Sequence, residues 1–387
     1  MNIADVFPPK DHVQRLYCGD CSKPLDLAYA DFHEEVSGVN ITITGLPVLR
    51  CPTCGRDHLP DRSRFFIIKL HQEATEEGTP DVRATRRKLK EDYRFTKVPF
   101  LYDPDDYRYI PGLERPFNVG FLTPIFFNRK VLLKYDTTPG YRVKFASTTY
   151  GTIVPDEGHD ICFGINRNGK VVMWLGDIAA LPDSEQFYLR SENVESDHSI
   201  GSEFYDGQIE CIYTEPTEEN RLYALRSRFV EACFKRFGEK IAHLDEEVLN
   251  LALGFNAPVV DTPKERRHVA DTLNKIYVES LDNAALGSLL KKAGADPKSL
   301  GSLKRLEALL ETVANGADIP TILSPFFVLY DLRVAYSHLT SDDHATQFPK
   351  NVTTRLGIDP ASDLLELYHH LSKAMAASYE KLAKIVP

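Results

Sequence analysis

The chain has 387 residues, and its 43% hydrophobic content is enough to bury ordinary cores in two to three domains of about 150 residues each. Its 46 basic and 56 acidic residues give a formal charge of −10, which taken alone argues against nucleic-acid binding. No stretch approaches the ~20 apolar residues of a membrane helix, and the first ten residues do not resemble a signal peptide. Composition therefore predicts a globular, cytoplasmic protein without membrane contact.

The negative charge is concentrated in one segment. Residues 151–220 contain 3 basic and 15 acidic side chains, whereas residues 1–150 contain 22 and 20, and residues 221–387 contain 21 and 21. Because the chain outside this segment has a net charge of +2, the total charge does not exclude a polyanionic substrate. We interpret the acidic segment as an autoinhibitory or partner-binding surface.

Four of the seven cysteines form two close pairs, Cys18-Gly-Asp-Cys21 and Cys51-Pro-Thr-Cys54. Two such turns can supply the four thiolates of a tetrahedral zinc site. Residues 38–45, between the pairs, alternate like a β-strand, as a small zinc ribbon requires. Disulfides are the alternative, and they are disfavoured in a cytoplasmic chain. Four thiolates leave no open position on the metal, so the predicted zinc is structural, and no catalytic metal is expected.

The sequence GLPVLRCPTCGRDHL around the second pair gives this segment a family resemblance. Residues 15–72 resemble the YgiT-type zinc ribbon found at the start of certain bacterial antitoxins. The resemblance implies a protein-binding or organising module with no chemistry of its own. We assign residues 1–75 to this ribbon.

A basic segment follows the linker-like stretch at 76–80. Residues 83–97 hold seven basic against two acidic side chains, with Tyr93 and Phe95 among them. Such a segment can follow a phosphate backbone and stack bases, although a solvated helix face has the same composition. We treat residues 76–115 as a basic linker or helix. Its candidate RNA contacts are Arg83, Arg86, Arg87, Lys88 and Lys90.

From 116 to 217, short β-forming runs alternate with Gly, Pro and Asn turns, which predicts a mostly antiparallel, β-rich acidic domain. The expected strands cover 119–127, 130–135, 141–146, 161–165, 170–175, 186–189 and 208–213. Five polar residues near the end of this domain are interpreted as loop polarity, with a hard-metal site or a hydrolase as alternatives. They are Glu195, Asp197, His198, Glu203 and Asp206.

Beyond residue 217, apolar residues recur at steps of three and four, which is typical of amphipathic helices. The expected helices cover 221–240, 244–253, 264–281, 300–314, 325–339 and 360–384. They predict an all-α bundle over 218–387. The whole chain is therefore expected to be a multidomain α+β protein with a ribbon, a basic linker, a β-rich domain and a helical bundle.

The fifth expected helix carries the candidate catalytic residues. A Ser-Pro pair at 324–325 provides an N-cap and a first-turn proline, and the helix ends with Arg333 and His338. This pair suits RNA cleavage, because imidazole can move the proton of the 2′-OH while guanidinium holds the phosphate. In the structural alternative, Arg333 pairs with an acid such as Asp331 or Asp342, and His338 caps the helix.

The stretch SPFFVLYDLRVAYSHLTSDD resembles the HEPN superfamily, whose R-x4 to x6-H motif marks metal-independent endoribonucleases of toxin–antitoxin, CRISPR-associated and antiphage abortive-infection systems. The resemblance implies that Arg333 binds the phosphate and that His338 is the acid/base group. Many members have a polar residue after the arginine, where this chain has Val334. This difference implies either reduced activity or a polar contribution from Asp331, Tyr336 or Ser337.

Residues five apart on an ideal helix lie about 140° from one another, so Arg333 and His338 do not share one face. Either the helix frays near Ser337, or the two residues act across a symmetric interface. The family forms its cleft where two such helices meet across a two-fold interface, which implies a homodimer. We therefore predict a metal-independent endoribonuclease that cleaves RNA by 2′-OH attack, acts as an antiphage or toxin effector, and has a protein trigger or regulator. A non-catalytic adaptor, in which the ribbon and the bundle dock partners like an antitoxin module, is the alternative.

Overall fold

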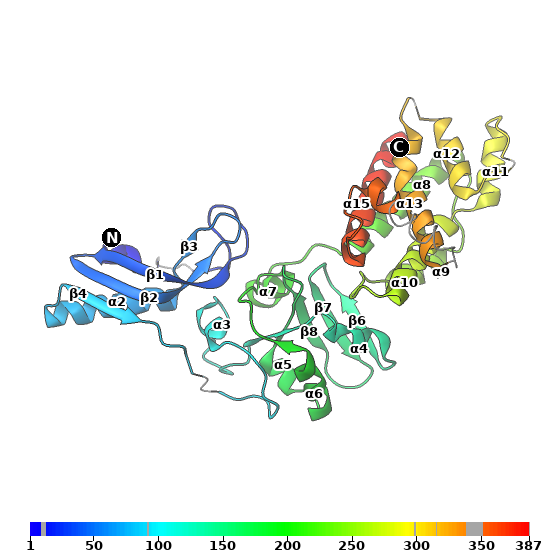
Figure 1. Cartoon of the computed structure of the whole chain (residues 1–387). Helices are drawn as coiled ribbons and strands as arrows, with labels where there is room; N and C mark the ends of the chain where they lie inside the picture. The colour runs from blue at the N-terminus through cyan, green and yellow to red at the C-terminus, as the bar shows by residue number, and fades with distance from the viewer. Residues whose placement is uncertain (9–12, 91–92, 298, 315, 338–350, 387) are drawn as a thin grey trace. The chain divides into compact units, whose positions relative to one another are not determined.

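The computed structural model describes residues 1–8, 13–90, 93–297, 299–314, 316–337 and 351–386. The chain divides into two compact units, Met1–Glu215 (unit 1) and Pro216–Pro387 (unit 2) (Figure 1). Both β-sheets belong to unit 1, and unit 2 is helical. The ribbon, linker and β-rich domain expected from the sequence therefore all lie within one compact unit.

The first sheet of unit 1 comprises, in the described residues, β1 (Asp26–Val36), β2 (Val39–Arg50), β3 (Asp57–His58) and β4 (Asp81–Thr85). β2 is paired antiparallel with β1 and β3 and parallel with β4. The turn between β1 and β2 uses Ser37 and Gly38, both with positive φ, as tight hairpins require. The strand expected over 38–45 therefore lies mostly in the first part of β2.

Helix α2 (Asp61–Glu77) packs on this sheet, next to the short helix α1 (Ile3–Val6). Its end explains the stretch at 76–80, which is the last turn and cap of a helix and not a linker. Gly78 has a φ of 69°, the left-handed conformation that commonly ends helices, and its amide donates to the last turn. The core between helix and sheet contains Ile41, Ile43, Leu46, Ile67, Ile68 and Ala74.

The second sheet contains β5 (Pro124–Phe127), β6 (Tyr141–Phe145), β7 (Tyr150–Pro155), β8 (Ile161–Ile165), β9 (Val171–Trp174) and β10 (Asn193–Val194). Its strand order is β10-β5-β9-β8-β7-β6, and the described pairings are antiparallel, as expected for this region. The short helices α3 (Pro104–Tyr109), α5 (Leu175–Ala179) and α7 (Glu203–Tyr205) accompany the sheet.

Three of the expected strands are wrong because their residues form helices. They are 130–135 in α4 (Val131–Thr137), 186–189 in α6 (Asp183–Glu192), and 208–213, which begins in the π-helix η1 (Asp206–Glu210). In α6 the buried residues Gln186 and Leu189 are three positions apart, which is a helical period. β7 was not expected.

One hydrophobic core joins the cysteine-containing segment to the second sheet. Trp174, which is 1% exposed, stacks on Phe204 at a ring-centroid distance of 4.8 Å inside it. The segment around the cysteines is therefore part of a larger folded body. Other members of this core are Leu16, Cys18, Leu25, Leu49, Cys51, Phe126 and Val172.

Unit 2 has a core of its own. Each expected helix of this region has a counterpart, and α11 was not expected. None of the described helices combines the length and the apolar character that a membrane span requires. The helices with described bounds are α8 (Glu218–Phe237), α9 (Asp245–Gly254), α10 (Pro263–Asn274), the π-helix η2 (Lys275–Glu279), α11 (Asn283–Lys292), α12 (Ser302–Glu311), α13 (Ile319–Ser337) and α15 (Leu364–Ile385), and residues 351–356 are also helical.

Helix α13 begins at Ile319, which corrects the expected start at Pro325. Asp318 accepts hydrogen bonds from the amide and the hydroxyl of Thr321, at 3.2 and 2.5 Å, and these bonds lower the pKa of Asp318. Pro325 therefore lies inside the helix, where it has no amide proton to donate to Thr321. The buried residues Ile319 and Leu323 extend the apolar helix toward the N-terminus beyond the proline.

Candidate functional site

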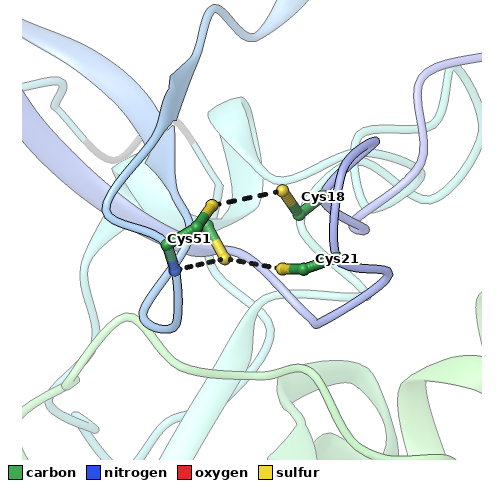
Figure 2. A group of neighbouring side chains, drawn as sticks. Cys18, Cys21 and Cys51 are labelled. Carbon is green, nitrogen blue, oxygen red and sulfur yellow. Dashed lines mark hydrogen bonds between the residues drawn. The ribbon is translucent and has the colours of Figure 1, made fainter.

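Two turns of unit 1 bring the four predicted cysteine ligands together. The sulfur atoms of Cys18, Cys21, Cys51 and Cys54 all lie within 4.8 Å of one another. The Sγ atoms of Cys21 and Cys51 are 3.4 Å apart, and those of Cys18 and Cys54 are 3.7 Å apart. Figure 2 shows the side chains of Cys18, Cys21 and Cys51 converging on one point. The predicted gathering of these thiols is confirmed.

The two turns share one backbone pattern. In each, the amide of the first cysteine donates to the carbonyl five residues later, at 2.9 and 2.8 Å. The amide four residues later donates back to the carbonyl of that cysteine, at 2.9 Å in both turns. The residue at this fourth position has positive φ, 54° at Ser22 and 73° at Gly55. An ion pair between Asp20 and Arg56 links one turn to the other.

The crowding of the thiols perturbs their ionisation. Burial opposes ionisation of Cys51, but hydrogen bonds from the amides of Cys54 and Thr53 lower its pKa to about 6. The hydrogen bond with Cys51 raises the pKa of Cys21 to about 12. A bound cation would remove this conflict, because it compensates the charge of several thiolates at once. Such an all-sulfur donor set fits a metal ion such as zinc and leaves it no open position.

The candidate nuclease residues lie in unit 2, where the last turns of α13 face α10 and η2. The hydroxyl of Ser337 donates to Asp271 Oδ1 at 2.6 Å. Arg333 Nε lies 3.7 Å from the same oxygen, and Arg333 Nη2 lies 3.5 Å from Glu279 Oε1. Arg333 and Ser337 share a face because they are four residues apart. The Arg333 side chain remains 31% exposed.

The other predicted residues of this site have different partners. Asp331 accepts a hydrogen bond from Arg355 at 2.7 Å, and the hydroxyl of Tyr336 accepts one from Arg266 at 3.2 Å. Within the described part of the chain, neither is hydrogen-bonded or ion-paired with Arg333. His338, the predicted acid/base residue, lies outside the described residues, as does Asp342.

The acidic neighbours of Arg333 were not foreseen from the sequence. Residues 264–281 were expected to form one α-helix, but α10 gives way to the π-helix η2, whose last residue is Glu279. Asn274, 1% exposed, donates to Glu279 Oε1 at 2.9 Å, and its Oδ1 has no partner among the described residues. π-Helical turns are frequent at functional sites. The signal available in the sequence was a polar residue, Asn274, within the apolar pattern three positions after Asp271.

The described residues of the basic segment form the end of β4 and irregular chain, not a helix, and two of its five predicted RNA contacts are engaged elsewhere. Arg86 follows β4, pairs with the fully buried Asp105, and lies 3.9 Å above the ring of Tyr29. Burial opposes its charge, but Asp105 raises the pKa of Arg86. Lys88 lies 3.4 Å from Asp103. These two cations therefore hold the segment against α3.

The remaining three basic residues, Arg83, Arg87 and Lys90, are exposed. In the portion that the structure describes, no ion pair involves Arg83 or Arg87. The two aromatic residues predicted to stack bases are half-buried and engaged. Tyr93 packs edge-on against Tyr107 at 5.4 Å, and Phe95 does the same against Phe121 at 6.1 Å.

The five polar residues between 195 and 206 do not converge. Glu203 accepts hydrogen bonds from the amide and the hydroxyl of Thr149, at 2.8 and 2.9 Å, and Asp206 accepts one from Tyr17. Among the described residues, the four cysteines are the only group of three or more ligands that could hold a metal ion. A hard-metal site is therefore absent from the described part of this region.

His198, which is partly exposed, pairs with the buried Asp106 of α3. Its Nδ1 lies 2.7 Å from Asp106 Oδ1, and the Asp106 side chain is fully buried. Burial opposes protonation, but the hydrogen bond and the charge of Asp106 raise the pKa of His198. The pair fixes the loop around His198, where φ is 61°, against α3.

No family model, no curated protein and no solved structure matches this chain. Any function must therefore be argued from its own residues and geometry.

Proposed function

We propose that unit 2 is a metal-independent endoribonuclease of the HEPN type. In this proposal the 2′-oxygen attacks the adjacent phosphorus, and the bond to the 5′-oxygen of the next nucleotide breaks, giving a 2′,3′-cyclic phosphate and a free 5′-OH. His338 moves the proton of the attacking or the leaving oxygen, and Arg333 binds the phosphate as its charge rises.

The observation that supports this proposal most is the setting of Arg333. The guanidinium is partly exposed near the end of a long helix, and its two carboxylate contacts, at 3.5 and 3.7 Å, are longer than hydrogen bonds. Within the part of the chain that the structure describes, a phosphate can therefore bind Arg333 in bidentate fashion without breaking a tight pair. Asp271 also anchors Ser337, the residue before His338 in the sequence, at 2.6 Å.

The remaining elements of the proposal follow the family resemblance. Two copies of the chain form the RNA cleft, the four-cysteine group holds a structural zinc ion, and a protein trigger or regulator controls the activity. Antiphage defence or toxin action in the cytoplasm is the proposed setting.

A second proposal is a non-catalytic adaptor in which the ribbon and the bundle dock other proteins. One observation favours it: among the described residues, the charged groups nearest Arg333 are the carboxylates of Asp271 and Glu279. In this case Arg333 has a structural role and holds α13 to α10 and η2. The two proposals differ in what the loss of Arg333 changes, since only the first predicts loss of an activity.

The deciding experiment incubates the purified full-length protein with labelled tRNA and total RNA in the presence of EDTA. We expect cleavage by the native protein and a loss of about 100-fold or more in Arg333→Ala and His338→Ala. Arg236→Ala and His370→Ala, at exposed positions of unit 2, are the matched controls and should cleave normally. Equal cleavage by all variants would remove this site. No cleavage by any of them, even with phage-infected lysate added, would favour the adaptor.

A further inference from the structure

Unit 1 contains a groove of about 700 Å³ between α2 and β4. Figure 1 shows these two elements next to each other beside the β1–β2 hairpin. Residues Ile43, Leu46 and Pro47 of β2 line the groove, together with the α2 side chains on one side and residues 83–87 and Leu89 on the other. The groove is therefore made by an edge strand, the chain that follows it, and one helix.

Helix α2 presents an unusual face to this groove. Arg62, Phe65, Phe66 and Lys69 line it, at the spacing that places side chains on one side of a helix. Phe65 is 55% exposed and Phe66 is 37% exposed. The other face of α2 packs in the core with smaller apolar residues, Ile67, Ile68 and Ala74. Two exposed aromatic rings flanked by cations are the arrangement used by stacking platforms for bases.

The charge of the groove is of one sign. Five basic and no acidic side chains line it. Arg83 and Arg87 are exposed and make no ion pair with another described residue, so their guanidinium groups are free for an external anion. Arg62 pairs with Glu114 and Lys69 with Glu73 at the surface, and such pairs exchange readily for phosphate.

We propose that this groove binds a single strand of nucleic acid, with phosphates on Arg83 and Arg87 and bases stacked on Phe65 and Phe66. Base stacking on a side chain requires unpaired bases, which excludes a duplex. An acidic peptide would satisfy the cations but leaves both phenylalanine rings exposed. The proposal does not depend on nuclease activity, because every residue in it lies in unit 1.

The test measures binding of labelled oligo(U) and oligo(dT) by fluorescence anisotropy. The full-length chain carries Arg333→Ala throughout, so that cleavage cannot affect the result. The Arg83→Ala/Arg87→Ala double variant should weaken binding at least 10-fold and lower the slope of log affinity against log salt by about 1.4, as expected for two lost phosphate contacts. Phe65→Ala should weaken binding about 5-fold or more, and Phe65→Tyr should restore it.

The controls are an exposed aromatic residue and an exposed cation elsewhere in unit 1. Phe187→Ala removes an aromatic ring that is 64% exposed on α6, and Lys144→Ala removes an exposed cation on β6. Neither should alter binding. The proposal would be overturned if the control variants weakened binding as much as the groove variants do. It would also be overturned if duplex RNA bound as tightly as the single strands, or if polyglutamate displaced the labelled oligomer as well as unlabelled oligomer does. Binding of either oligomer that the groove variants weaken supports it, and the tighter-bound oligomer shows which of the two polymers is preferred.

Discussion

The pairing of His198 with the buried Asp106 makes the stability of unit 1 depend on pH. The pKa of His198 is raised in the folded chain, so the folded state binds this proton more tightly than the unfolded state does. Its stabilisation is therefore complete below the unfolded pKa of about 6.5 and is lost as the pH rises through the folded pKa. Burial also raises the pKa of Asp106, and its ionisation acts in the same direction.

We expect the melting temperature of unit 1 to fall by roughly 3 °C between pH 6 and 8, the effect of about 1 kcal/mol in a domain of this size. Thermal unfolding followed by tryptophan fluorescence measures this change. His198→Gln should abolish most of the pH dependence, and His159→Gln, at an exposed position of the same unit, should preserve it. Equal slopes in His198→Gln and the native protein would contradict the prediction.

The cysteine group, the His198–Asp106 pair and the groove differ in how well the sequence could predict them. The cysteine ligands were predictable because each C-x2-C pair fixes its own turn, and only one long-range contact then remains. His198 and Asp106 are 92 residues apart, so no local spacing connects them. The groove shows the same limit, because Arg83 was recognised by composition, whereas its relation to Phe65 depends on the parallel pairing of β4 with β2.

At the scale of elements, periodicity predicted the helices of unit 2 well and the short elements of unit 1 poorly. A helix of 20 residues such as α8 repeats its apolar pattern several times, whereas a helix of seven such as α4 shows it only once. β-Branched and aromatic residues in α4 and in η1 then suggested strands. The sequence pattern did not predict the π-helix η2, because a π-helix changes the register of a helix without changing its apolar character.

Pro325 offers a test of how α13 is built. In the interior of the helix its missing amide costs about 3 kcal/mol, whereas its rigid ring reduces the entropy of the unfolded chain by up to about 1 kcal/mol. Pro325→Ala should therefore raise the free energy of unfolding of unit 2 by about 2 kcal/mol. Urea titration followed by far-UV circular dichroism measures it.

Pro320 provides the matched control because it lies in the first turn of the same helix, where an amide has no acceptor within the helix. Pro320→Ala should lower stability slightly, by about 0.4–1 kcal/mol, through the unfolded state alone. If Pro320→Ala and Pro325→Ala both destabilise unit 2 to the same extent, the helix does not gain a hydrogen bond at Pro325.

At the scale of the whole molecule, the acidic segment is also a structural part of unit 1, and its autoinhibitory or partner-binding role stays a prediction. Residues 151–220 include most of β7 together with β8 and β9, which are central to the second sheet. Deletion of this segment would therefore remove the core of unit 1, and its acidic surface must be tested by point substitution. The unit boundary at Glu215 lies near the predicted start of the helical bundle, because composition and periodicity change together there.

The two units have separate cores, which allows the metal to be tested in the intact chain. Trp174 is the only tryptophan, and it shares a buried core with Cys18 and Cys51, so its fluorescence reports on unit 1. Far-UV circular dichroism is dominated by helices, most of which lie in unit 2. If the four cysteines hold a structural zinc ion, the native protein contains one zinc ion per chain. Loss of that ion then affects the Trp174 fluorescence.

We expect Cys51→Ser to lose the metal and to lower the fluorescence transition by roughly 10 °C or more, because a structural zinc site contributes several kcal/mol to folding. The melting temperature measured by far-UV circular dichroism should not change. As a control, Cys211→Ser, at an exposed cysteine of unit 1, should change neither metal content nor stability. Elemental analysis and the two unfolding curves provide the measurements. A Cys51→Ser protein that retains its zinc would refute the ligand assignment. A shift of both transitions together would instead show that the metal stabilises the two units as one cooperative body.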